Sequence, residues 1–434
     1  MTLQQDEHWA AELEILGPGI SQAVAWAGLV IAHAEGAHLT DSDGQTYLDL
    51  MGGAGVNLIG HSHPDYTAAL TRQLNQWMTG AHASTARLDA LRGLTALLPR
   101  ALERVQFYSG GAEAVEAAIR LAKSATGKFE ILAFWRGFHG RTAAALAATG
   151  NARGGLGPAM PGIHTTPYAY CYRCPLKTSY PGCGFACVEF ARETLREQSS
   201  DSLAAILVEP VQGRSGNVVP PPGYFSALRE LADEHDALLI SDESMTGLGR
   251  TGTILASEHD QVTPDIAILG KGLGNGYPVS AITAPTALME QGPYGKPSAS
   301  SSSYGGFPLA CAAVAAVTTA VRTDHLAERS HDLGTRLLAK LEALIPITGI
   351  VGDIRGQGLA IGIELVTDQA TRQPLGKDRL HAVFNDLLTA GILVMTGGSS
   401  LRLYPPLTID PRDLDHAAEV IAAVLARHQG ATAP

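Results

Sequence analysis

The chain has 434 residues, which is long for a single hydrophobic core and indicates two structural lobes. Its content of 45% hydrophobic and 17% charged residues is typical of a globular protein. The 31 basic and 42 acidic side chains give a net charge of −11, and this excess of negative charge argues against nucleic acid or an anionic membrane as a partner.

The first residues carry acidic side chains where a secretory leader has basic ones. No stretch approaches the roughly 18 apolar residues of a membrane span. Five cysteines in a chain of this length do not form the dense pattern of a secreted disulfide scaffold. We therefore expect a cytoplasmic protein.

The first two thirds of the chain predict an α/β fold. Residues 38–53 indicate a hairpin with an Asp-Gly turn. Further on, apolar runs at 104–109, 129–135, 203–210, 237–243 and 266–272 alternate with amphipathic helical patterns, among them 110–127 and 223–236. This alternation predicts a mostly parallel sheet with helices on both faces. Such a sheet binds its ligand at the carboxyl ends of its strands.

A second, smaller α+β lobe is predicted after Pro308. A long Ala-rich helical pattern at 309–344 precedes strand-like and helical segments at 360–366, 378–391, 392–397, 401–406 and 413–429. We expect three parts: 1–60 as an N-terminal segment joining the small domain, 61–310 as the large ligand-binding domain with a Cys-rich insert at 168–190, and 311–434 as the small domain.

One lysine stands at the end of an apolar strand, where residues 266–269 run into Gly270 and Lys271. Burial there lowers the pKa of the amine, so that a usable fraction is neutral and nucleophilic. The surrounding glycines let backbone or a flat ligand approach closely. A nucleotide-binding phosphate loop is excluded, because Asp265 and Gly272 occupy the places of its required Gly and Ser/Thr. The alternative is a surface lysine in a glycine loop.

Three further stretches place cofactor-binding groups at predicted strand ends. Gly110, Gly111 and Ala112 lie where a strand gives way to a helix, whose free N–H groups bind phosphate. Asp242 ends an apolar strand, and a buried carboxylate needs a cation such as the protonated ring nitrogen of pyridoxal phosphate. Phe138 is placed to stack on a flat ring.

Eight motifs stand in a characteristic order along nearly the whole chain. They are GHSHP (60–64), SGGAEAVEAAIRLAK (109–123), FHGRT (138–142), EPVQG (209–213), SDESMTGLGRTG (241–252), PDIAILGKGLGNGYP (264–278), SYGGFPLACAA (303–313) and LRLYPPLTI (401–409). With them the chain resembles the class III aminotransferases, which are fold-type I pyridoxal-phosphate enzymes. The resemblance implies a large domain with a mostly parallel, seven-stranded-type sheet between helices, plus a smaller α+β domain.

The resemblance implies a role for each matching residue. Lys271 binds the cofactor covalently and moves a proton between the substrate α-carbon and C4′ of the cofactor, and Asp242 pairs with the pyridine nitrogen. The other cofactor-binding residues are Gly110, Gly111 and Ala112 at the phosphate, Phe138 on the ring, and His139, Glu209 and Met245 nearby. Ser303 reaches the phosphate of a neighbouring subunit's cofactor, which implies a homodimer or a dimer of dimers with shared sites.

Arginines carry the prediction for the substrate. By resemblance, Arg141 binds a side-chain or ω-carboxylate and Arg402 binds the α-carboxylate, through a planar fork that lysine cannot reproduce. The alternative for Arg141 is a solvated or structural side chain. Arg214 stands where relatives acting on 4-aminobutyrate or ornithine have a glutamate that neutralises the second arginine. A cation there either adds a carboxylate contact or points away.

The expected activity is transfer of an amino group from an ω-amino acid such as 4-aminobutyrate to an oxo acid such as 2-oxoglutarate, in ping-pong fashion through pyridoxamine phosphate. An amino-acid racemase or epimerase, or a decarboxylating transaminase, are alternatives on the same scaffold. Ala54 replaces the glutamine of the decarboxylating relatives, and Met245 replaces a glutamine that donates to the cofactor. The intact Lys271, Asp242 and Arg402 argue against a non-enzymatic cofactor carrier.

A cysteine-rich loop interrupts the middle of the chain. It has the spacing C-x2-C-x8-C-x3-C, formed by Cys171, Cys174, Cys183 and Cys187. Four thiolates at such spacing predict zinc or an iron–sulfur cluster, and free thiols or disulfides are the alternatives. Cys311 lies in an Ala-rich helix and is expected in the core.

Overall fold

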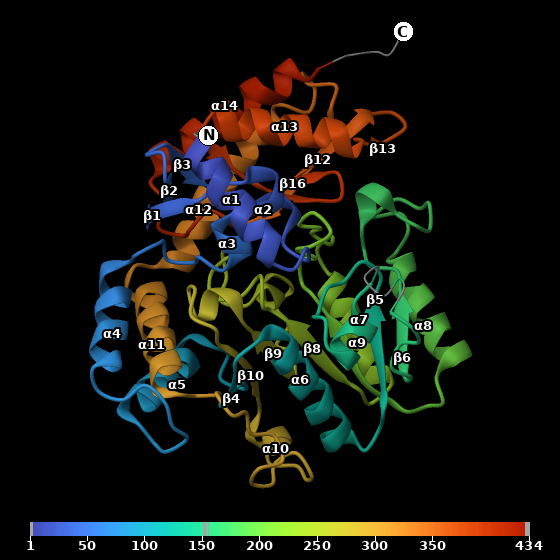
Figure 1. Cartoon of the computed structure of the whole chain (residues 1–434). Helices are drawn as coiled ribbons and strands as arrows, with labels where there is room; N and C mark the ends of the chain where they lie inside the picture. The colour runs from blue at the N-terminus through green and yellow to red at the C-terminus, as the bar shows by residue number, and fades with distance from the viewer. Residues whose placement is uncertain (1–2, 151–153, 155, 430–434) are drawn as a thin grey trace.

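The computed structural model describes residues 3–150, 154 and 156–429. Figure 1 shows a lower body built around one twisted sheet and an upper body to which both ends of the chain contribute. None of the described helices is long and apolar enough to cross a membrane.

The lower body contains a sheet with seven strands in the described part of the chain, in the order β4-β10-β9-β8-β7-β5-β6. The strands are β4 (Arg104–Tyr108), β5 (Glu130–Phe134), β6 (Ile163–Thr166), β7 (Leu203–Val208), β8 (Leu238–Asp242), β9 (Ile266–Leu269) and β10 (Ser280–Ala284). β10 runs antiparallel to both of its neighbours, and the remaining pairs are parallel. The predicted mostly parallel sheet is therefore confirmed.

Helices cover both faces of this sheet, because side chains alternate along the strands. In β5, Ile131 and Ala133 pack with α6 and α7, whereas Leu132 and Phe134 pack with α8 and α9. The helices of this body are α6 (Gly111–Thr126), α7 (Ala143–Ala148), α8 (Ala186–Gln198), α9 (Tyr224–Glu234) and the short α10 (Thr286–Met289). Strands buried on both faces read as continuous apolar runs, which is why β7 was recognisable from its sequence.

Two smaller sheets form the upper body within the described residues. One has the order β1-β2-β3-β14 and the other β11-β12-β16-β15, with β13 paired to β12. Their strands are β1 (Ile31–Glu35), β2 (His38–Asp41), β3 (Thr46–Asp49), β11 (Val351–Gln357), β12 (Ala360–Asp368), β13 (Gln373–Pro374), β14 (Ile392–Leu393), β15 (Met395–Gly397) and β16 (Ser400–Leu403). β2 and β3 confirm the predicted hairpin. Parallel pairing of β3 with β14 ties the N-terminal segment to the C-terminal part of the chain.

The remaining helices flank these sheets and the first one. They are α1 (Leu3–Ile15), α2 (Gln22–Ala27), α3 (Gly52–Gly55), α4 (Pro64–Leu74), α5 (Thr85–Leu97), α11 (Pro308–Thr323), α12 (Leu326–Glu342), α13 (Lys377–Thr389) and α14 (Pro411–Arg427). The single helix suggested at 309–344 is wrong: His325 has a left-handed backbone, with φ of 50°, and separates α11 from α12. The predicted division into domains stays a prediction, and its boundary at 310 falls inside α11.

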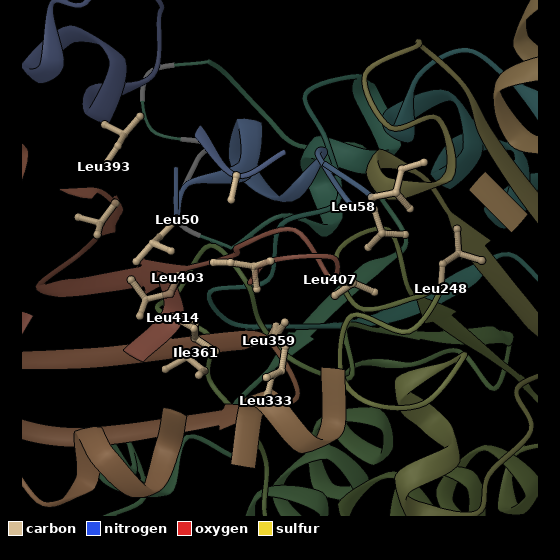
Figure 2. Packing of buried hydrophobic residues seen from close by; sticks show 14 of the residues in the cluster. Leu50, Leu58, Leu248, Leu333, Leu359, Ile361, Leu393, Leu403, Leu407 and Leu414 are labelled. Atoms are coloured by element: carbon tan, nitrogen blue, oxygen red, sulfur yellow. The ribbon is translucent and has the colours of Figure 1, made fainter. Parts of the chain in front are cut away.

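One apolar cluster joins the upper body to the edge of the large sheet. Figure 2 shows Leu58, Leu407 and Leu248 near one another, and it shows Leu359 and Leu333 together below Leu407. Backbone bonds reinforce the contact, since the N–H of Leu407 donates to the carbonyl of Leu58 at 2.7 Å. The two bodies therefore share a core next to the carboxyl ends of the central strands.

Candidate functional site

Four ionisable side chains gather where parallel strands of the large sheet end. His139 follows β5, Glu209 follows β7, Asp242 ends β8 and Lys271 follows β9. Because these strands are parallel, their carboxyl ends lie at one edge of the sheet. We call these four residues the strand-end cluster. The structure brings these side chains close enough to influence one another's pKa values.

Asp242 and His139 form a buried pair. Nδ1 of His139 lies 2.8 Å from Oδ2 of Asp242, and the backbone N–H of Ser244 donates to Oδ1 of Asp242 at 3.1 Å. Burial raises the pKa of Asp242, but the bond to His139, the charges of His139 and Lys271 and the bond from Ser244 together outweigh it, so the pKa lies below its usual value. Burial lowers the pKa of His139, but the bond to Asp242 and the charges of Asp242 and Glu209 together raise it above its usual value. Asp242 is thus held as an anion.

Lys271 is partly buried at the start of a short 3-10 turn, Lys271–Leu273. Its backbone is left-handed, with φ of 44°, which is uncommon for a residue other than glycine. Burial lowers the pKa of its amine, and the charges of Asp242 and Glu209 offset only part of this effect. Within the described part of the chain, no hydrogen bond holds the amine. A free, partly neutral amine is what a lysine nucleophile requires.

The glycines around Lys271 let the chain pack closely against itself, which is one of the two roles that we expected of them. A Cβ on Gly272 would lie 3.1 Å from Cβ of Leu58, and a Cβ on Gly274 would lie 2.0 Å from the carbonyl oxygen of Tyr277. A Cβ on Gly270 would make only ordinary contacts of 3.5 Å with Ser244. The other expected role, making room for a flat ring, stays a prediction.

Glu209 is buried and accepts hydrogen bonds from the backbone. Its Oε1 accepts from the N–H of Phe138 at 2.8 Å, and its Oε2 accepts from the N–H of Gly213 at 3.4 Å. Burial raises its pKa to about 7, against the opposing charge of His139. The carboxyl group thus fixes the loops that carry Phe138 and Gly213.

The N-terminus of α6 opens at the same edge of the sheet. Gly110 caps this helix, and the hydroxyl of Ser280 donates to the carbonyl of Gly110 at 2.8 Å. A Cβ added at Gly110 or Gly111 would meet nothing within 4 Å, so there is open space in front of the first helical N–H groups. Gly140 approaches Ala112 so closely that its Cβ would lie 2.6 Å from Cβ of Ala112. This arrangement is suited to an anion such as phosphate.

Three arginines gather near Phe138, and we call them the arginine cluster: Arg141 and Arg214 contact its ring, and Arg402 lies close enough to lower the pKa of Arg214. Cζ of Arg214 is 4.8 Å from the ring centroid, and Cζ of Arg141 is 5.5 Å from it. Arg402, in β16, is buried, and its two Nη atoms donate to backbone carbonyls at 3.1 and 2.6 Å. Burial, together with the charges of Arg141 and Arg402, lowers the pKa of Arg214. Arg214 thus points toward the other two arginines and not away from them.

Met245 and Ser303 complete the predicted set. Sδ of Met245 lies against Gly55, where a Cβ would be 2.5 Å away, so the thioether packs between the turn at α3 and the loop that contains Gly213. Ser303 is exposed in the loop that precedes α11, next to Tyr304, which is 69% exposed. Its predicted contact with another subunit's cofactor stays a prediction.

Two positioning contacts were not predicted from the sequence. Oγ1 of Thr149 accepts from the N–H of His139 at 3.0 Å and donates to the carbonyl of Ala145 at 2.8 Å. The hydroxyl of Tyr404 donates to Oδ1 of Asn217 and so braces the loop after Gly213. Tyr404 lies in the LRLYPP motif and could have been predicted from it, whereas nothing in the sequence pattern marks Thr149.

The cysteine loop does not support the predicted metal or cluster site. All four cysteines line one small cavity and are free thiols. Within the described residues, no three His, Cys, Asp or Glu side chains are arranged to hold a metal ion. Burial raises the pKa of Cys187 to about 11 and also raises that of Cys171, which disfavours their thiolates, whereas hydrogen bonds outweigh burial and lower the pKa of Cys174. The structure therefore does not support a zinc site or an iron–sulfur cluster at these four cysteines. Cys311 is buried in α11, as expected.

The site as a whole fits pyridoxal phosphate. The cofactor needs an amine for its aldehyde, an anion for its ring nitrogen and N–H donors for its phosphate. Lys271 with its lowered pKa, the ionised Asp242 and the open helix terminus at Gly110 supply these groups at one edge of the sheet. A sheet of this topology with this site defines a pyridoxal-phosphate-dependent transferase of fold type I.

Comparison with known proteins agrees with this assignment and also identifies the family. The model of the family described as aminotransferase class-III matches residues 21–425. An acetylornithine aminotransferase of Methanothermobacter thermautotrophicus is 34% identical, covering 94% of this chain and 96% of the relative. A leucine/methionine racemase of Thermococcus litoralis is 31% identical, with 93% and 92% covered. A solved amine transaminase from an uncultivated Pseudomonas species has a TM-score of 0.89 and 32% identity, covering 95% of this chain and 98% of its own. The chain belongs to the class III aminotransferase family and is a pyridoxal-phosphate-dependent enzyme.

Proposed function

We propose that the enzyme transfers an amino group from an ω-amino acid, of which 4-aminobutyrate is the simplest example, to an oxo acid such as 2-oxoglutarate. The observation that carries this proposal is the arginine cluster beside the strand-end cluster. Guanidinium groups recognise carboxylates through two parallel hydrogen bonds, so a carboxylate-bearing amine and a dicarboxylate oxo acid both fit. Small amino and oxo acids are thus the proposed partners.

The proposed chemistry divides between the cofactor and the chain. When bound, pyridoxal phosphate supplies an electron sink for the bond that breaks at the substrate carbon. Lys271 holds the cofactor and then carries the proton from the carbon bearing the amine. Asp242, kept ionised by His139, stabilises a proton on the ring nitrogen. Gly110, Gly111 and Ala112 offer N–H groups to the phosphate, and Phe138 faces the ring.

Two residues orient the substrate in this proposal. Arg141 binds the distal carboxylate of either substrate, and Arg402 binds the carboxylate on the reacting carbon of the oxo acid. Arg402 is suited to this, because its Nε is buried without a hydrogen-bond partner in the described part of the chain. An incoming carboxylate near it would relieve an unpaired buried donor.

A second candidate is an amino-acid racemase, which the similarity to the Thermococcus litoralis relative favours. Removal of the α-proton by Lys271 is common to both reactions, and they differ in whether nitrogen leaves the substrate. A decarboxylating transaminase would in addition release carbon dioxide. Ala54, with its left-handed φ of 63°, has only a methyl group where that reaction's family pattern has an amide.

The test is to follow one labelled amine. The holoenzyme is mixed with 15N-labelled 4-aminobutyrate, acetylornithine or leucine in turn, each with 2-oxoglutarate, and product glutamate is analysed by mass spectrometry. We expect 15N in glutamate with at least one ω-amino donor. Inversion of leucine with the label retained, and no labelled glutamate from any donor, would contradict amine transfer and favour the racemase.

A homodimer or dimer of dimers in the cytoplasm completes the proposal. The apolar side chains of Leu74, Met78, Leu88 and Tyr304 are between 45% and 69% exposed, as expected for a surface that another subunit covers. Tyr304 is adjacent to Ser303, whose hydroxyl would reach the neighbouring cofactor's phosphate. The cytoplasm is the proposed compartment, because the sparse cysteines do not form a secreted disulfide scaffold.

A further inference from the structure

The arginine cluster is a concentration of positive charge without a matching carboxylate. None of the three guanidinium groups forms an ion pair among the described residues. The acidic group that influences Arg214 is Glu209, whose pKa is raised to about 7 by burial. Near neutral pH this carboxyl group is therefore only partly charged. Arg402 is buried and Arg141 and Arg214 are exposed, so three cations with at most one anion attract a further anion to the mouth of the site.

Arg214 is placed in the arginine cluster by its position in the chain and by a contact with Phe138. It follows Gly213 directly, and the carbonyl of Gly213 accepts from Nη1 of Arg402 at 3.1 Å. Its guanidinium group stacks on Phe138 at 4.8 Å, so it cannot turn outward without losing this contact. The side chain is exposed, and the contact with Phe138 favours the orientation that keeps its charge beside Arg402 and Arg141.

We propose that Arg214 determines specificity: it selects substrates whose charge, apart from the reacting amine, is negative, and it rejects substrates with a second ammonium group. The argument deepens the proposed function and depends on it, because it concerns the donor of the same reaction. Carboxylate-ended ω-amino acids, N-acylated diamino acids and dicarboxylates satisfy this condition. Free diamino acids do not, because their second ammonium would enter a site that already holds three positive charges.

Binding of molecules that cannot react tests the proposal first. Glutarate has two carboxylates, whereas 4-(trimethylammonio)butanoate has one carboxylate and one fixed positive charge at similar length. Isothermal titration of the holoenzyme should show glutarate binding at least about tenfold more tightly. In Arg214→Glu this preference should fall by about tenfold or more, and in Arg214→Gln by an intermediate amount. A preference that stays within about twofold of wild type in Arg214→Glu would overturn the proposal.

Half-reaction kinetics test the same claim with donors. N-acetylornithine and ornithine share a carbon skeleton and differ by one positive charge. Loss of the cofactor's visible absorbance gives kcat/KM for each donor. The ratio of kcat/KM for N-acetylornithine to kcat/KM for ornithine should fall by about tenfold or more in Arg214→Glu. Arg372→Gln is the control, since Arg372 stacks on Tyr172 at 4.9 Å in the cysteine loop and should leave the ratio unchanged. An unchanged ratio in Arg214→Glu with active amine transfer overturns only this inference, whereas absence of amine transfer from every donor overturns the proposed function.

Discussion

Glu209 is a residue whose ionisation depends strongly on its surroundings. Its pKa is raised from 4.5 to about 7 because it is buried, although it accepts N–H bonds from Phe138 and Gly213. A carboxyl group whose pKa is raised on folding favours the folded state at low pH. This contribution is complete below the unfolded pKa of 4.5 and is lost as the pH rises through about 7.

The prediction at this scale uses Glu209→Gln, which keeps the neutral form at every pH. The free energy of unfolding of the wild-type apo-enzyme should fall relative to the variant by about 3 kcal/mol between pH 4.5 and about pH 8. Urea unfolding at a series of pH values measures the difference. The titration of His139 and Asp242 is common to both proteins and largely cancels. Two parallel stability curves would show that Glu209 is not held protonated.

Residue identities at the strand ends could be predicted from the sequence, and their supporting bonds could not. Asp242 and Lys271 each follow a continuous apolar run, and parallel strands bring such residues to one edge. The contact of Thr149 with His139 depends on how the loop after β5 folds back, which no periodicity encodes. The contact of Gly272 with Leu58 could not be predicted for the same reason, because Leu58 lies more than 200 positions away in the chain.

At the scale of elements, the first turn of α6 is positioned by one glycine. Gly140 has φ of 140°, and a Cβ there would lie 2.6 Å from Cβ and 3.0 Å from Cα of Ala112. The loop after β5 and the phosphate-facing helix terminus are therefore in direct contact. A side chain at this point must displace the helix end.

Gly140→Ala should weaken cofactor binding by about tenfold and lower the free energy of unfolding by about 1–3 kcal/mol. Absorbance titration of the apo-enzyme with pyridoxal phosphate and urea unfolding measure the two effects. Gly376→Ala is the matched control, because Gly376 has φ of −62° and open space around its Cα. Wild-type affinity in Gly140→Ala would mean that this contact does not position the helix terminus.

Most elements could be predicted because their apolar patterns are unambiguous. β5, β7, β8 and β9 are apolar runs between turns, and α6 has a regular apolar face. The exception at 309–344 is instructive, since α11 and α12 are both helical and only the left-handed backbone of His325 separates them. Histidine adopts that conformation infrequently, so composition gave no reason to end the helix there.

At the scale of the whole molecule, Glu364 connects the cysteine loop to the upper body. This carboxylate in β12 accepts from the hydroxyl of Tyr170 at 2.6 Å, from Nε of Arg173 at 2.8 Å and from Nη2 of Arg355 at 2.8 Å. The hydroxyls of Ser399 and Ser400 also donate to it. Burial raises its pKa, but the charge of Arg355 and these bonds lower it to about 2.

Glu364→Gln should therefore destabilise the enzyme by about 3 kcal/mol at neutral pH, because Arg173 loses its anion and Arg355 is left with Asp353 alone. A carboxyl group with a lowered pKa contributes stability above its unfolded pKa of 4.5 and loses it as the pH falls toward about 2. The difference between variant and wild type should thus shrink between pH 7 and pH 3 in urea unfolding. Asp415→Asn, which alters an exposed ion pair with Arg336, should have little effect. A constant difference across this pH range would contradict the assignment.

The most direct test of the whole account is to locate the cofactor on the chain. The holoenzyme is reduced with borohydride, which fixes the cofactor to whichever amine carries it, and the digested protein is analysed by mass spectrometry. We predict that the phosphopyridoxyl group is on Lys271, in near-stoichiometric amount, and that Lys271→Ala carries none. A label on another lysine, or a reduced protein that carries no label, would contradict the role given to Lys271.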